Sequence, residues 1–252
     1  MSKVVLITGI NGNLAKKILG YFSKQYTIIG LDIHDHDDVI TKDSFELGLH
    51  YYIKCDLRNE YSISEAFDIL KKKRIFPGVL INNAAIDSVP LSNQRTTGME
   101  VNNFEDIMSV NLKAPIILSN HCINYWIPES IKGNIINISS IYSEVSPDPA
   151  LYSEGFVKNV FYGASKAALN SITYQLATIF SEHGIRVNGL LLAGVFSGNQ
   201  DFSFQKKYLQ RIPIGRFLEV EEIFDSISLL LSERNSYMTG SIIKVDGGYT
   251  SI

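Results

Sequence analysis

The chain has 252 residues, of which 45% are apolar and 19% are charged, and its formal net charge is −3. This length and composition suit one α/β domain with a large core, so we expect a single domain spanning residues 1–252. The lysines and arginines are scattered, and no apolar run approaches the roughly 20 residues of a membrane span, which argues against nucleic acid and membranes as partners. The N-terminal apolar run is too short for a signal peptide, and the two cysteines fall in a predicted strand and a predicted helix. A cytoplasmic protein with reduced thiols is therefore expected.

Strand-like apolar runs alternate with segments of helical period along the whole chain. Strands are predicted at Val4–Thr8, Tyr26–Leu31, Tyr51–Cys55, Val79–Asn82, Asn134–Ser139, Arg186–Leu192 and Ser241–Val245. Helices are predicted at residues 13–24, 61–73, 103–126, 161–183 and 219–232. Several strands are apolar without alternation, which is typical of a parallel sheet covered on both faces. The sequence therefore predicts a doubly wound α/β domain with a seven-stranded parallel sheet flanked by helices.

Three features interrupt this alternation. Pro115 lies within the predicted helix 103–126 and should kink it or end it early. Residues 87–101 and 198–216 have no clear period and are expected to be irregular. Because ligands bind beyond the carboxyl ends of the strands in this architecture, these two segments are candidate walls of a binding site, with simple surface loops as the alternative.

The turn after the first strand reads Thr8-Gly9-Ile10-Asn11-Gly12-Asn13-Leu14-Ala15 and opens the first predicted helix. At such a helix start, backbone N–H groups and the helix dipole can bind a pyrophosphate, and the two glycines permit close approach. A bare Gly-x-x-Gly can also be only a turn, but its position after the first strand favours a nucleotide. We expect the nucleotide to be contacted by Gly9, Asn11, Gly12, Asn13 and Leu14.

Asp32 ends the second predicted strand, where a carboxylate can accept hydrogen bonds from both adenosine ribose hydroxyls and would repel a 2′-phosphate. No lysine or arginine lies between Asp32 and Thr41 to neutralise such a phosphate. The sequence therefore favours NAD over NADP. The neighbouring run His34-Asp35-His36-Asp37-Asp38 has metal-ligand residue types, but adjacent residues in an extended segment point in opposite directions. We predict a solvated loop and no metal.

Tyr162 and Lys166 are four positions apart in a predicted helix and share one helix face. A tyrosine with a pKa near 10 is about 0.1% ionised at neutral pH, and a nearby cation can lower that pKa by roughly 1–3 units. Such a phenol can exchange protons with a substrate. The isolated pair is a weak signal, but Asn111 and Ser140 precede it in order, and each of the four alone could be merely structural.

Together these residues make the chain resemble the short-chain dehydrogenase/reductase family along essentially its whole length, which implies a Rossmann-type fold. By this resemblance, Tyr162 is the acid/base, Lys166 its activator, Ser140 the residue that orients the substrate, and Asn111 a structural and proton-relay residue. The segment Asn82-Asn83-Ala84-Ala85 resembles the family's Asn-Asn-Ala-Gly beside the cofactor. Further matches are Arg186-Val187-Asn188 at the sixth strand and Asp246-Gly247-Gly248-Tyr249 near the C-terminus.

The resemblance also implies cofactor contacts beyond the first turn. The residues expected to make them are Asp56, Leu57, Asn83, Ala84, Ala85, Tyr162, Lys166 and Val195. Asp56 follows the third strand and would hold the adenine amine, although it could instead cap the next helix. In the family, the helices corresponding to 103–126 and 161–183 pair between subunits, which implies a homotetramer or homodimer.

The chain departs from the family pattern at three places. Asn13 and Ala15 replace glycines of the classical motif, Ala85 and Ala193 are small replacements in other motifs, and extra residues lie between Ser140 and Tyr162, within 142–161. This insertion contains Tyr152 and several polar residues that could hold a hydroxyl-rich ligand. Similar insertions occur in members associated with bacterial surface-sugar pathways, so a sugar or sugar derivative of a surface-polysaccharide pathway is the expected substrate.

The expected function is thus NAD-dependent hydride transfer between nicotinamide and a hydroxyl or carbonyl group of a small polar substrate. Two alternatives stay open at this point. One is a nucleotide-binding module without turnover, which the altered glycine motif would allow. The other is an epimerase or dehydratase that uses NAD transiently and returns it unchanged.

Overall fold

The computed structural model describes residues 3–35, 49–87, 97–99, 101–152, 154–196 and 201–252. Its centre is a parallel sheet with the strand order β3-β2-β1-β4-β5-β6-β7, which confirms the predicted fold class. The strands are β1 (Val4–Thr8), β2 (Thr27–Asp32), β3 (Leu49–Lys54), β4 (Val79–Asn82), β5 (Asn134–Ser140), β6 (Arg186–Leu192) and β7 (Ile242–Val245). The order reverses between β1 and β4, which is the point where open α/β sheets bind ligands.

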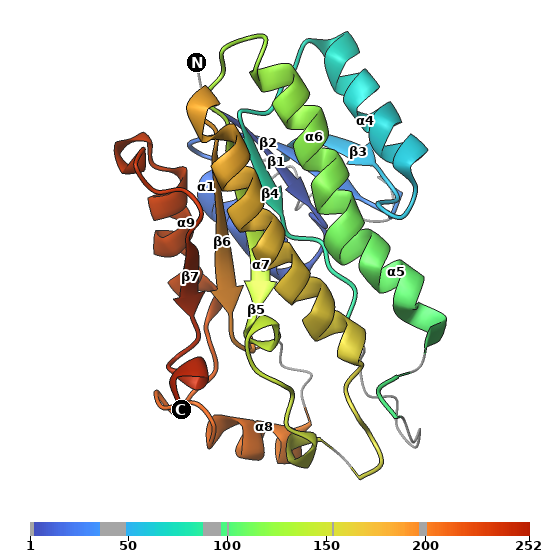
Figure 1. Cartoon of the computed structure of the whole chain (residues 1–252), viewed down its shortest axis with the longest axis vertical. Coiled ribbons are helices and arrows are strands. Elements are labelled where there is room, and N and C mark those ends of the chain that lie inside the picture. Colours follow the sequence, from blue (N-terminus) through green and yellow to red (C-terminus); the bar gives the residue numbers. More distant parts are fainter. Residues whose placement is uncertain (1–2, 36–48, 88–96, 100, 153, 197–200) are drawn as a thin grey trace.

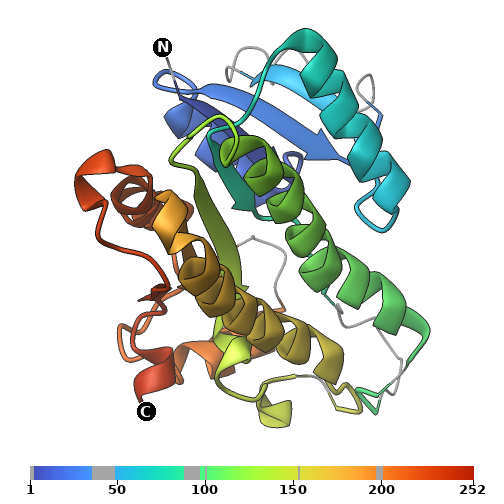
Figure 2. The same cartoon turned by 45° about the horizontal axis from the view of Figure 1, so that its top comes forward.

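Helices cover both faces of this sheet (Figure 1, Figure 2). One face carries α1 (Asn13–Phe22) and α9 (Phe224–Leu231), and the other carries α4 (Glu60–Lys73), α6 (Ala114–Trp126) and α7 (Val160–Phe180). The expected 161–183 helix continues past α7 as a 3-10 turn over Ser181–His183, and the 219–232 helix begins with a 3-10 turn over Val220–Ile223. Strand and helix boundaries therefore agree with the predictions to within a few residues.

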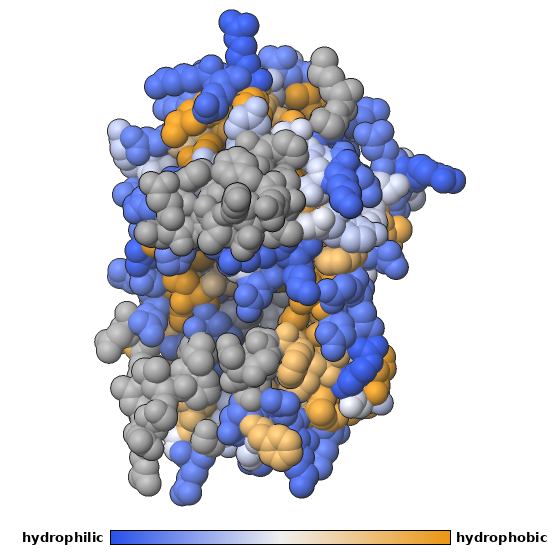
Figure 3. Space-filling model, turned by 180° about the vertical axis from the view of Figure 1, so that it is seen from behind, coloured by the Kyte–Doolittle hydropathy of each residue, from blue (hydrophilic) through white to orange (hydrophobic). Residues whose placement is uncertain are grey.

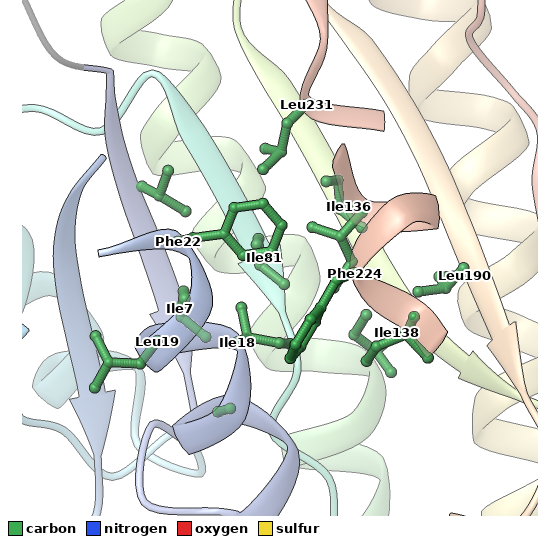
Figure 4. Close-up of a cluster of buried hydrophobic side chains, with 14 of the residues drawn as sticks. Ile7, Ile18, Leu19, Phe22, Ile81, Ile136, Ile138, Leu190, Phe224 and Leu231 are labelled. Atoms are coloured by element: carbon green, nitrogen blue, oxygen red, sulfur yellow. The ribbon is translucent and has the colours of Figure 1, made fainter. Parts of the chain in front are cut away.

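The face under α1 and α9 is held by a continuous apolar cluster. Ile18 and Phe22 of α1 meet Phe224 of α9 above Ile81 and Ile136 of the sheet (Figure 4). These strand residues belong to β4 and β5, whose residues are all buried, because helices cover both sides of the sheet centre. This packing fixes the carboxyl ends of the central strands, from which the site is built.

The opposite face has its own cluster, centred on Trp126. The indole ring is fully buried and its Nε1–H donates to the carbonyl oxygen of Pro77 at 2.7 Å. Such a partner is what a buried tryptophan requires. The cluster binds α4, α6 and α7 to the sheet and so fixes the helix that carries Tyr162 and Lys166.

The predicted 103–126 helix forms, with an irregularity before Pro115. It begins as α5 (Phe104–Met108), continues as a π-helical turn over Ser109–Lys113, and resumes as α6. Pro115 stands in the first turn of α6, where a missing N–H is tolerated. The π-helical turn accommodates the proline, and the helix continues to Trp126 instead of ending early. Such turns are frequent at functional sites, and this one contains Asn111.

The prediction that 198–216 is irregular is wrong for part of that segment. Phe202–Leu209 form the helix α8, and the side chain of Asp201 caps it by accepting a hydrogen bond from the N–H of Phe204 at 3.1 Å. The first four residues of this helix alternate between apolar and polar as in a strand, so the sequence signal for a helix is weak without the cap. Residues 197–200 and most of 87–101 lie outside the described residues, as does 36–38 of the predicted solvated loop.

The insertion between Ser140 and Tyr162 packs beneath the carboxyl ends of β5 and β6, beside α8 (Figure 1). It contains 3-10 turns over Ile141–Ser143 and Pro149–Leu151. Its Tyr152 ring lies 5.4 Å from that of Phe204 on α8, and Asp148 pairs with Arg211 beyond the end of α8. The insertion and α8 therefore form one wall next to the site.

The surface opposite to the Figure 1 view is mostly hydrophilic, with apolar patches separated by polar residues (Figure 3). In the described ranges, no helix has the length and apolar character needed to cross a membrane. Over the same ranges, His, Cys, Asp and Glu side chains do not gather into a group of three that could hold a metal ion.

Candidate active site

A cavity of about 550 Å³ opens at the carboxyl ends of the strands around the switch point. It brings together residues that are far apart in the sequence, which is the arrangement expected of a cofactor site. Of the predicted residues, its lining includes Gly9, Gly12, Asn13, Leu14, Asp32, Asp56, Leu57, Asn83, Ala84, Ala85, Ser140, Tyr162, Lys166 and Val195. The other two predicted residues, Asn11 and Asn111, act on this cavity through hydrogen bonds to its lining or to neighbouring backbone.

The turn after β1 leaves the start of α1 open to a ligand. Gly9 has a φ of +65°, and a Cβ at this position would lie 3.0 Å from the Cα of Ala84, so only glycine fits here. Gly12 precedes α1 and has no side chain to cap it, and the first turn of α1 contains no acidic residue. The N–H groups at this helix start can therefore receive a pyrophosphate, as the sequence predicts.

Asp32 lies at the end of β2 and is mostly buried at the edge of the cavity. Its Oδ2 accepts a hydrogen bond from the backbone N–H of Asn11 at 3.0 Å, and its Oδ1 accepts a longer one from the N–H of His34 at 3.4 Å. These contacts fix the carboxylate beside the glycine turn. A carboxylate in this position has acceptor capacity left for ribose hydroxyls.

Two cations that were not predicted as site residues lie on β3 and in the loop after it. Lys54 of β3 pairs in register with Asp32, and its Nζ lies 2.8 Å from both carboxylate oxygens of Asp35. Arg58 lines the cavity and bonds both Asp56 and Asp106. The sequence gives little indication of Lys54 and Arg58, because they belong to the next strand and the loop after it and not to the segment around Asp32. Both cations are already neutralised by carboxylates.

Asp56 does not cap the helix that follows it, so that alternative is wrong. The cap of α4 is Asn59, whose side chain accepts from the N–H of Tyr61 at 2.9 Å. Asp56 instead accepts from the backbone N–H of Arg58 at 3.0 Å and from its guanidinium. This guanidinium holds the pKa of the Asp56 carboxyl below its usual value.

The segment after β4 is tied to the first turn by Thr8. The Oγ1 of Thr8 accepts from the N–H groups of Asn83 and Ala84, both at 3.0 Å, and the side chain of Asn83 donates to the Thr8 carbonyl at 2.9 Å. The two loops that line the cavity therefore hold each other. Thr8 was not among the predicted site residues, since it acts on the backbone of its neighbours.

Tyr162 and Lys166 lie in the first turns of α7, which begins where Asn159 accepts from the N–H of Phe161 at 2.8 Å. The following Gly163 packs against the carbonyl oxygen of Tyr142, which a Cβ would approach to 2.8 Å. The Nζ of Lys166 lies 5.9 Å from the centre of the Tyr162 ring. The helix thus brings phenol and amine together, with Ser140 at the end of β5 completing the group in the cavity.

The electrostatic state of this pair differs from the sequence argument. Burial lowers the pKa of Lys166 to about 8, and its Nζ donates to the carbonyl oxygen of Ile138 at 2.8 Å. The pKa of Tyr162 is raised, mainly by burial and next by the charge of Asp87, while a hydrogen bond with Ser140 lowers it. In the protein alone, burial and the charge of Asp87 therefore outweigh the hydrogen bond with Ser140, and the pKa moves in the direction opposite to the expected one.

Asn111 holds the strand-end segment in place from the π-helical turn. Its Oδ1 accepts from the N–H of Ile86 at 2.7 Å, and its Nδ2 donates to the Ile86 carbonyl at 2.9 Å and to the Oγ of Ser165 at 3.1 Å. Ser165 is the neighbour of Lys166. Asn111 thus connects the backbone beside the cavity to the helix that carries the catalytic candidates.

Two further residues beside Tyr162 were not predicted as site residues. Lys158, from the insertion, binds Asp87 with a distance of 2.6 Å between Nζ and Oδ2. The same Nζ lies 5.3 Å from the ring centres of both Tyr142 and Tyr162. Asp87 lies two positions after the segment Asn82-Asn83-Ala84-Ala85, and that position is the signal that could have marked it.

Comparison with known proteins agrees with this geometry. A family model described as enoyl-(acyl carrier protein) reductase matches residues 21–250. The chain is 33% identical to an L-xylulose reductase of Caenorhabditis elegans, with 99% of the chain and 96% of that protein covered. It is 26% identical to glucose 1-dehydrogenase 2 of Bacillus subtilis (strain 168), with 98% and 95% covered.

A solved structure shows the same fold. It is a short chain dehydrogenase from Leptospira borgpetersenii with bound NAD⁺, which is 29% identical to the chain and has a TM-score of 0.86, with 99% of the chain and 93% of that protein covered. The cavity, the order of the motifs and these matches lead to one conclusion. The chain belongs to the short-chain dehydrogenase/reductase family and is a nicotinamide-dependent oxidoreductase.

Proposed function

We propose that this protein is an NAD-dependent dehydrogenase that oxidises a hydroxyl group of a small sugar or sugar derivative, or reduces the corresponding carbonyl. The observation that carries the proposal is the gathering of Ser140, Tyr162 and Lys166 in the same cavity as the glycine turn and Asp32. This cavity has room for a nucleotide at one end and proton-transfer groups at the other. Residues 1–252 act as one domain in this proposal.

The side chains supply the proton chemistry. When NAD⁺ is bound, its nicotinamide accepts the hydride that leaves the carbinol carbon. Tyr162, as phenolate, takes the hydroxyl proton, so that the C–O bond becomes a carbonyl; in reduction the tyrosine returns the proton. Ser140 donates a hydrogen bond to the reacting oxygen, where charge develops. Lys166 is the cation that favours the phenolate, and Asn111 supports a proton path toward Lys166.

Burial makes this tyrosine depend on added positive charge. Its pKa is raised in the protein alone, so a cationic nicotinamide beside the phenol and the ammonium of Lys166 would both act to lower it. The pKa of Lys166, at about 8, allows the amine to exchange protons near neutral pH. The active tyrosine is thus coupled to the binding of the oxidised cofactor.

Asp32 supports the preference for NAD over NADP. A 2′-phosphate next to its carboxylate would face a negative charge in a mostly buried place. Lys54, which pairs in register with Asp32, and Arg58, which lines the cavity, are candidate counter-charges. Lys54 is ion-paired with Asp35, and Arg58 is ion-paired with Asp56 and Asp106. Neither is available to a phosphate without breaking an ion pair.

The insertion and the named relatives support a sugar as substrate. The wall formed by the insertion and α8 carries phenol groups near the site, and the hydroxyls of Tyr142 and Tyr152 lie 3.0 Å apart. Two relatives are named for the sugars glucose and L-xylulose. A surface-polysaccharide pathway is the biological setting that we propose for this activity.

We also propose that the protein is a cytoplasmic homotetramer or homodimer. Both cysteines are free and buried, as in a reducing compartment. The outer sides of α6 and α7 expose Ile116 and Tyr174, whereas Leu118 and Leu169 of the same helices are buried in the chain's own core. Exposed apolar side chains on two neighbouring helices suit pairing with a second copy.

The test is the absorbance at 340 nm when the purified protein is given NAD⁺ or NADP⁺ with sugars, polyols, sugar acids, sugar phosphates and nucleotide sugars. The proposal expects NADH formation with at least one sugar or polyol, and a lower kcat/KM with NADP⁺. NAD binding by calorimetry without turnover of any substrate would contradict the proposal and favour a binding module. Bound NAD with conversion of a sugar but no net NADH would indicate transient use of the cofactor.

A further inference from the structure

Beside Tyr162 lies an ion pair that the proton chemistry described above does not use. Lys158 comes from the insertion and Asp87 from the segment after β4, and the two residues are 71 positions apart in the sequence. The Lys158 side chain is only 9% exposed, while that of Asp87 is 36% exposed. Burying a charged side chain is costly unless it has partners, so the lysine end of this pair is withdrawn from water with Asp87 as its partner, while the carboxylate end stays open to a ligand.

The position of the pair is fixed from three directions. Asn111 holds both backbone polar groups of Ile86, the residue before Asp87. Lys158 precedes Asn159, the residue that caps α7, so the helix that carries Tyr162 also fixes Lys158. The ammonium lies between the rings of Tyr142 and Tyr162, at 5.3 Å from each centre.

The pair also has an electrostatic effect on the two catalytic candidates of α7. The charge of Asp87 raises the pKa of both Tyr162 and Lys166, which places this carboxylate within electrostatic reach of the reacting oxygen. Lys158 in addition lines a second cavity of about 390 Å³, together with Tyr142 and Tyr152 of the insertion. Lys158 therefore lies beside both the ring of Tyr162 and a second cavity.

We propose that Asp87 and Lys158 determine substrate specificity by binding a second hydroxyl of an uncharged polyhydroxylated substrate, next to the hydroxyl that Tyr162 deprotonates. This inference rests on the proposed function and names its substrate class. The carboxylate accepts a hydrogen bond from that hydroxyl and the ammonium donates one to it. A hydroxyl can do both at once, since it has one donor and two acceptor positions.

The charges of the pair disfavour two other substrate classes. A sugar acid or sugar phosphate would bring its anion next to Asp87, whose carboxylate is held in place by Lys158. A simple alcohol would exclude water from the pair without offering a hydrogen bond, and sites built for a substrate hydroxyl discriminate strongly against molecules that lack it. The pair thus selects for neutral substrates with neighbouring hydroxyls.

The experiment compares kcat/KM with NAD⁺ for xylitol and glucose, for gluconate and glucose 6-phosphate, and for propan-2-ol. The wild-type protein is expected to prefer the first two. In Asp87→Asn and Lys158→Met, kcat/KM for xylitol and glucose should fall about 10- to 100-fold relative to that for propan-2-ol. Asp87→Asn should also lose part of the discrimination against the two anions.

Three controls distinguish a change in substrate specificity from damage to the fold. Lys3→Met removes the cation of another ion pair, with Glu233, and should leave all ratios unchanged. Binding of NADH, followed by calorimetry, should be retained in Asp87→Asn and Lys158→Met, and Lys158→Arg should recover part of the xylitol activity. If a variant does not fold, the double variant Asp87→Asn/Lys158→Met, which buries no unpaired charge, takes its place.

The outcomes decide the inference separately from the proposed function. Unchanged substrate ratios in folded variants, or a wild-type preference for gluconate, glucose 6-phosphate or propan-2-ol, would overturn it while leaving the dehydrogenase intact. Absence of turnover with every substrate would count against the proposed function instead. In that case the inference is judged by calorimetric binding of xylitol to the NADH-loaded protein, which must be measurable in the wild type and weaker in Asp87→Asn.

Discussion

The Nζ of Lys166 donates a hydrogen bond to the carbonyl oxygen of Ile138 at 2.8 Å, so the amine of α7 is fixed to the end of β5. The lysine is buried, and this contact determines which way it points. Its charged form has lost most of its water, and burial lowers its pKa to about 8. The amine that we propose to assist catalysis is thus costly for folding at neutral pH.

We predict that Lys166→Met stabilises the fold at pH 7 and abolishes most activity. The pKa of Lys166 is about 8 in the folded protein against 10.5 for an ordinary lysine, which corresponds to a penalty of up to about 3 kcal/mol below pH 8. The unfolded chain binds the proton more strongly, so the free energy of unfolding of the wild type rises with pH between about 8 and 10.5. The advantage of the methionine variant should therefore shrink over that window.

The measurement is urea unfolding at pH 7 and at pH 9.5. Lys113→Met serves as the matched control, because the Lys113 side chain is 56% exposed and its pair with Glu60 lies at the surface. This variant should show no comparable pH trend. A Lys166→Met protein that is less stable than the wild type at pH 7, with the same pH dependence, would show that burial of the charge is not what costs stability.

Tyr162→Phe is expected to lower kcat by about 10²–10⁴-fold, because general acid–base catalysis contributes roughly that factor. The ring stays in place, so NADH binding should be nearly unchanged. Steady-state rates and calorimetric titration with NADH measure the two quantities. Tyr174→Phe is the control, since its ring is about half exposed on the outer part of α7. A phenylalanine variant with near-normal kcat would remove Tyr162 from the mechanism.

Asp32→Ser is expected to shift the cofactor preference toward NADP by about 10- to 100-fold in the ratio of kcat/KM values. The change removes hydrogen bonds between a charged group and the ribose, worth about 1.5–3 kcal/mol, and removes the charge that repels a 2′-phosphate. Asp35→Asn should add to the shift, since it releases the ammonium of Lys54. An unchanged ratio of the kcat/KM values for NADP and NAD in the double variant would mean that Asp32 does not determine the cofactor preference.

Tyr208→Phe should reduce the free energy of unfolding by about 1–3 kcal/mol. The buried hydroxyl of Tyr208 accepts the N–H of Gly194 at 2.7 Å, and phenylalanine leaves that N–H without its partner in the loop after β6. Urea unfolding measures the loss, with the fully exposed Tyr237→Phe as control. Equal stability of the two variants would show that another group accepts the hydrogen bond from the N–H of Gly194.

The sequence predicts the sheet well, and most of the residues predicted to bind the cofactor line one cavity, because their positions depend on local patterns. Continuous apolar runs indicate the strands directly, and most of the predicted cofactor residues lie at or just after strand ends that share one edge of the sheet, whereas Tyr162 and Lys166 lie on α7. Gly9 and Asp32 are examples, since the geometry of a strand end and a glycine turn leaves little choice. The helix α8 within 198–216 is harder to predict from the sequence, because it depends on the cap by Asp201 and on packing against the insertion.

What the sequence does not predict are contacts between segments far apart in the chain. Lys54 follows Asp32 by one strand, yet lies beside it in register. Lys158 meets Asp87 across 71 positions. The pKa of Tyr162 is a further case, because spacing reveals the nearby lysine but not the burial that opposes it. Burial and long-range pairing are properties of the folded chain, and they decide the electrostatics of the site.

The Asp87 and Lys158 pair gives a last prediction, in which the two charges act in opposite directions on Tyr162. Among the residues that the structure describes, the groups beside this phenol are Ser140 from β5, Tyr142 from the following turn, Lys166 from α7, and the pair itself. Asp87 raises the tyrosine pKa, so Asp87→Asn should lower it. Since oxidation needs the phenolate, the acid limb of the pH profile of kcat should then move to lower pH.

Lys158→Met should move the same limb to higher pH, because the carboxylate of Asp87 is left without the cation that neutralises it. The measurement is kcat for oxidation of the best substrate from about pH 5 to pH 10, in both single variants and in the double variant, with saturating NAD⁺. The double variant removes both charges and should return close to the wild type. Shifts in the same direction in both single variants would contradict an electrostatic effect and indicate that the changes disturb the position of Tyr162.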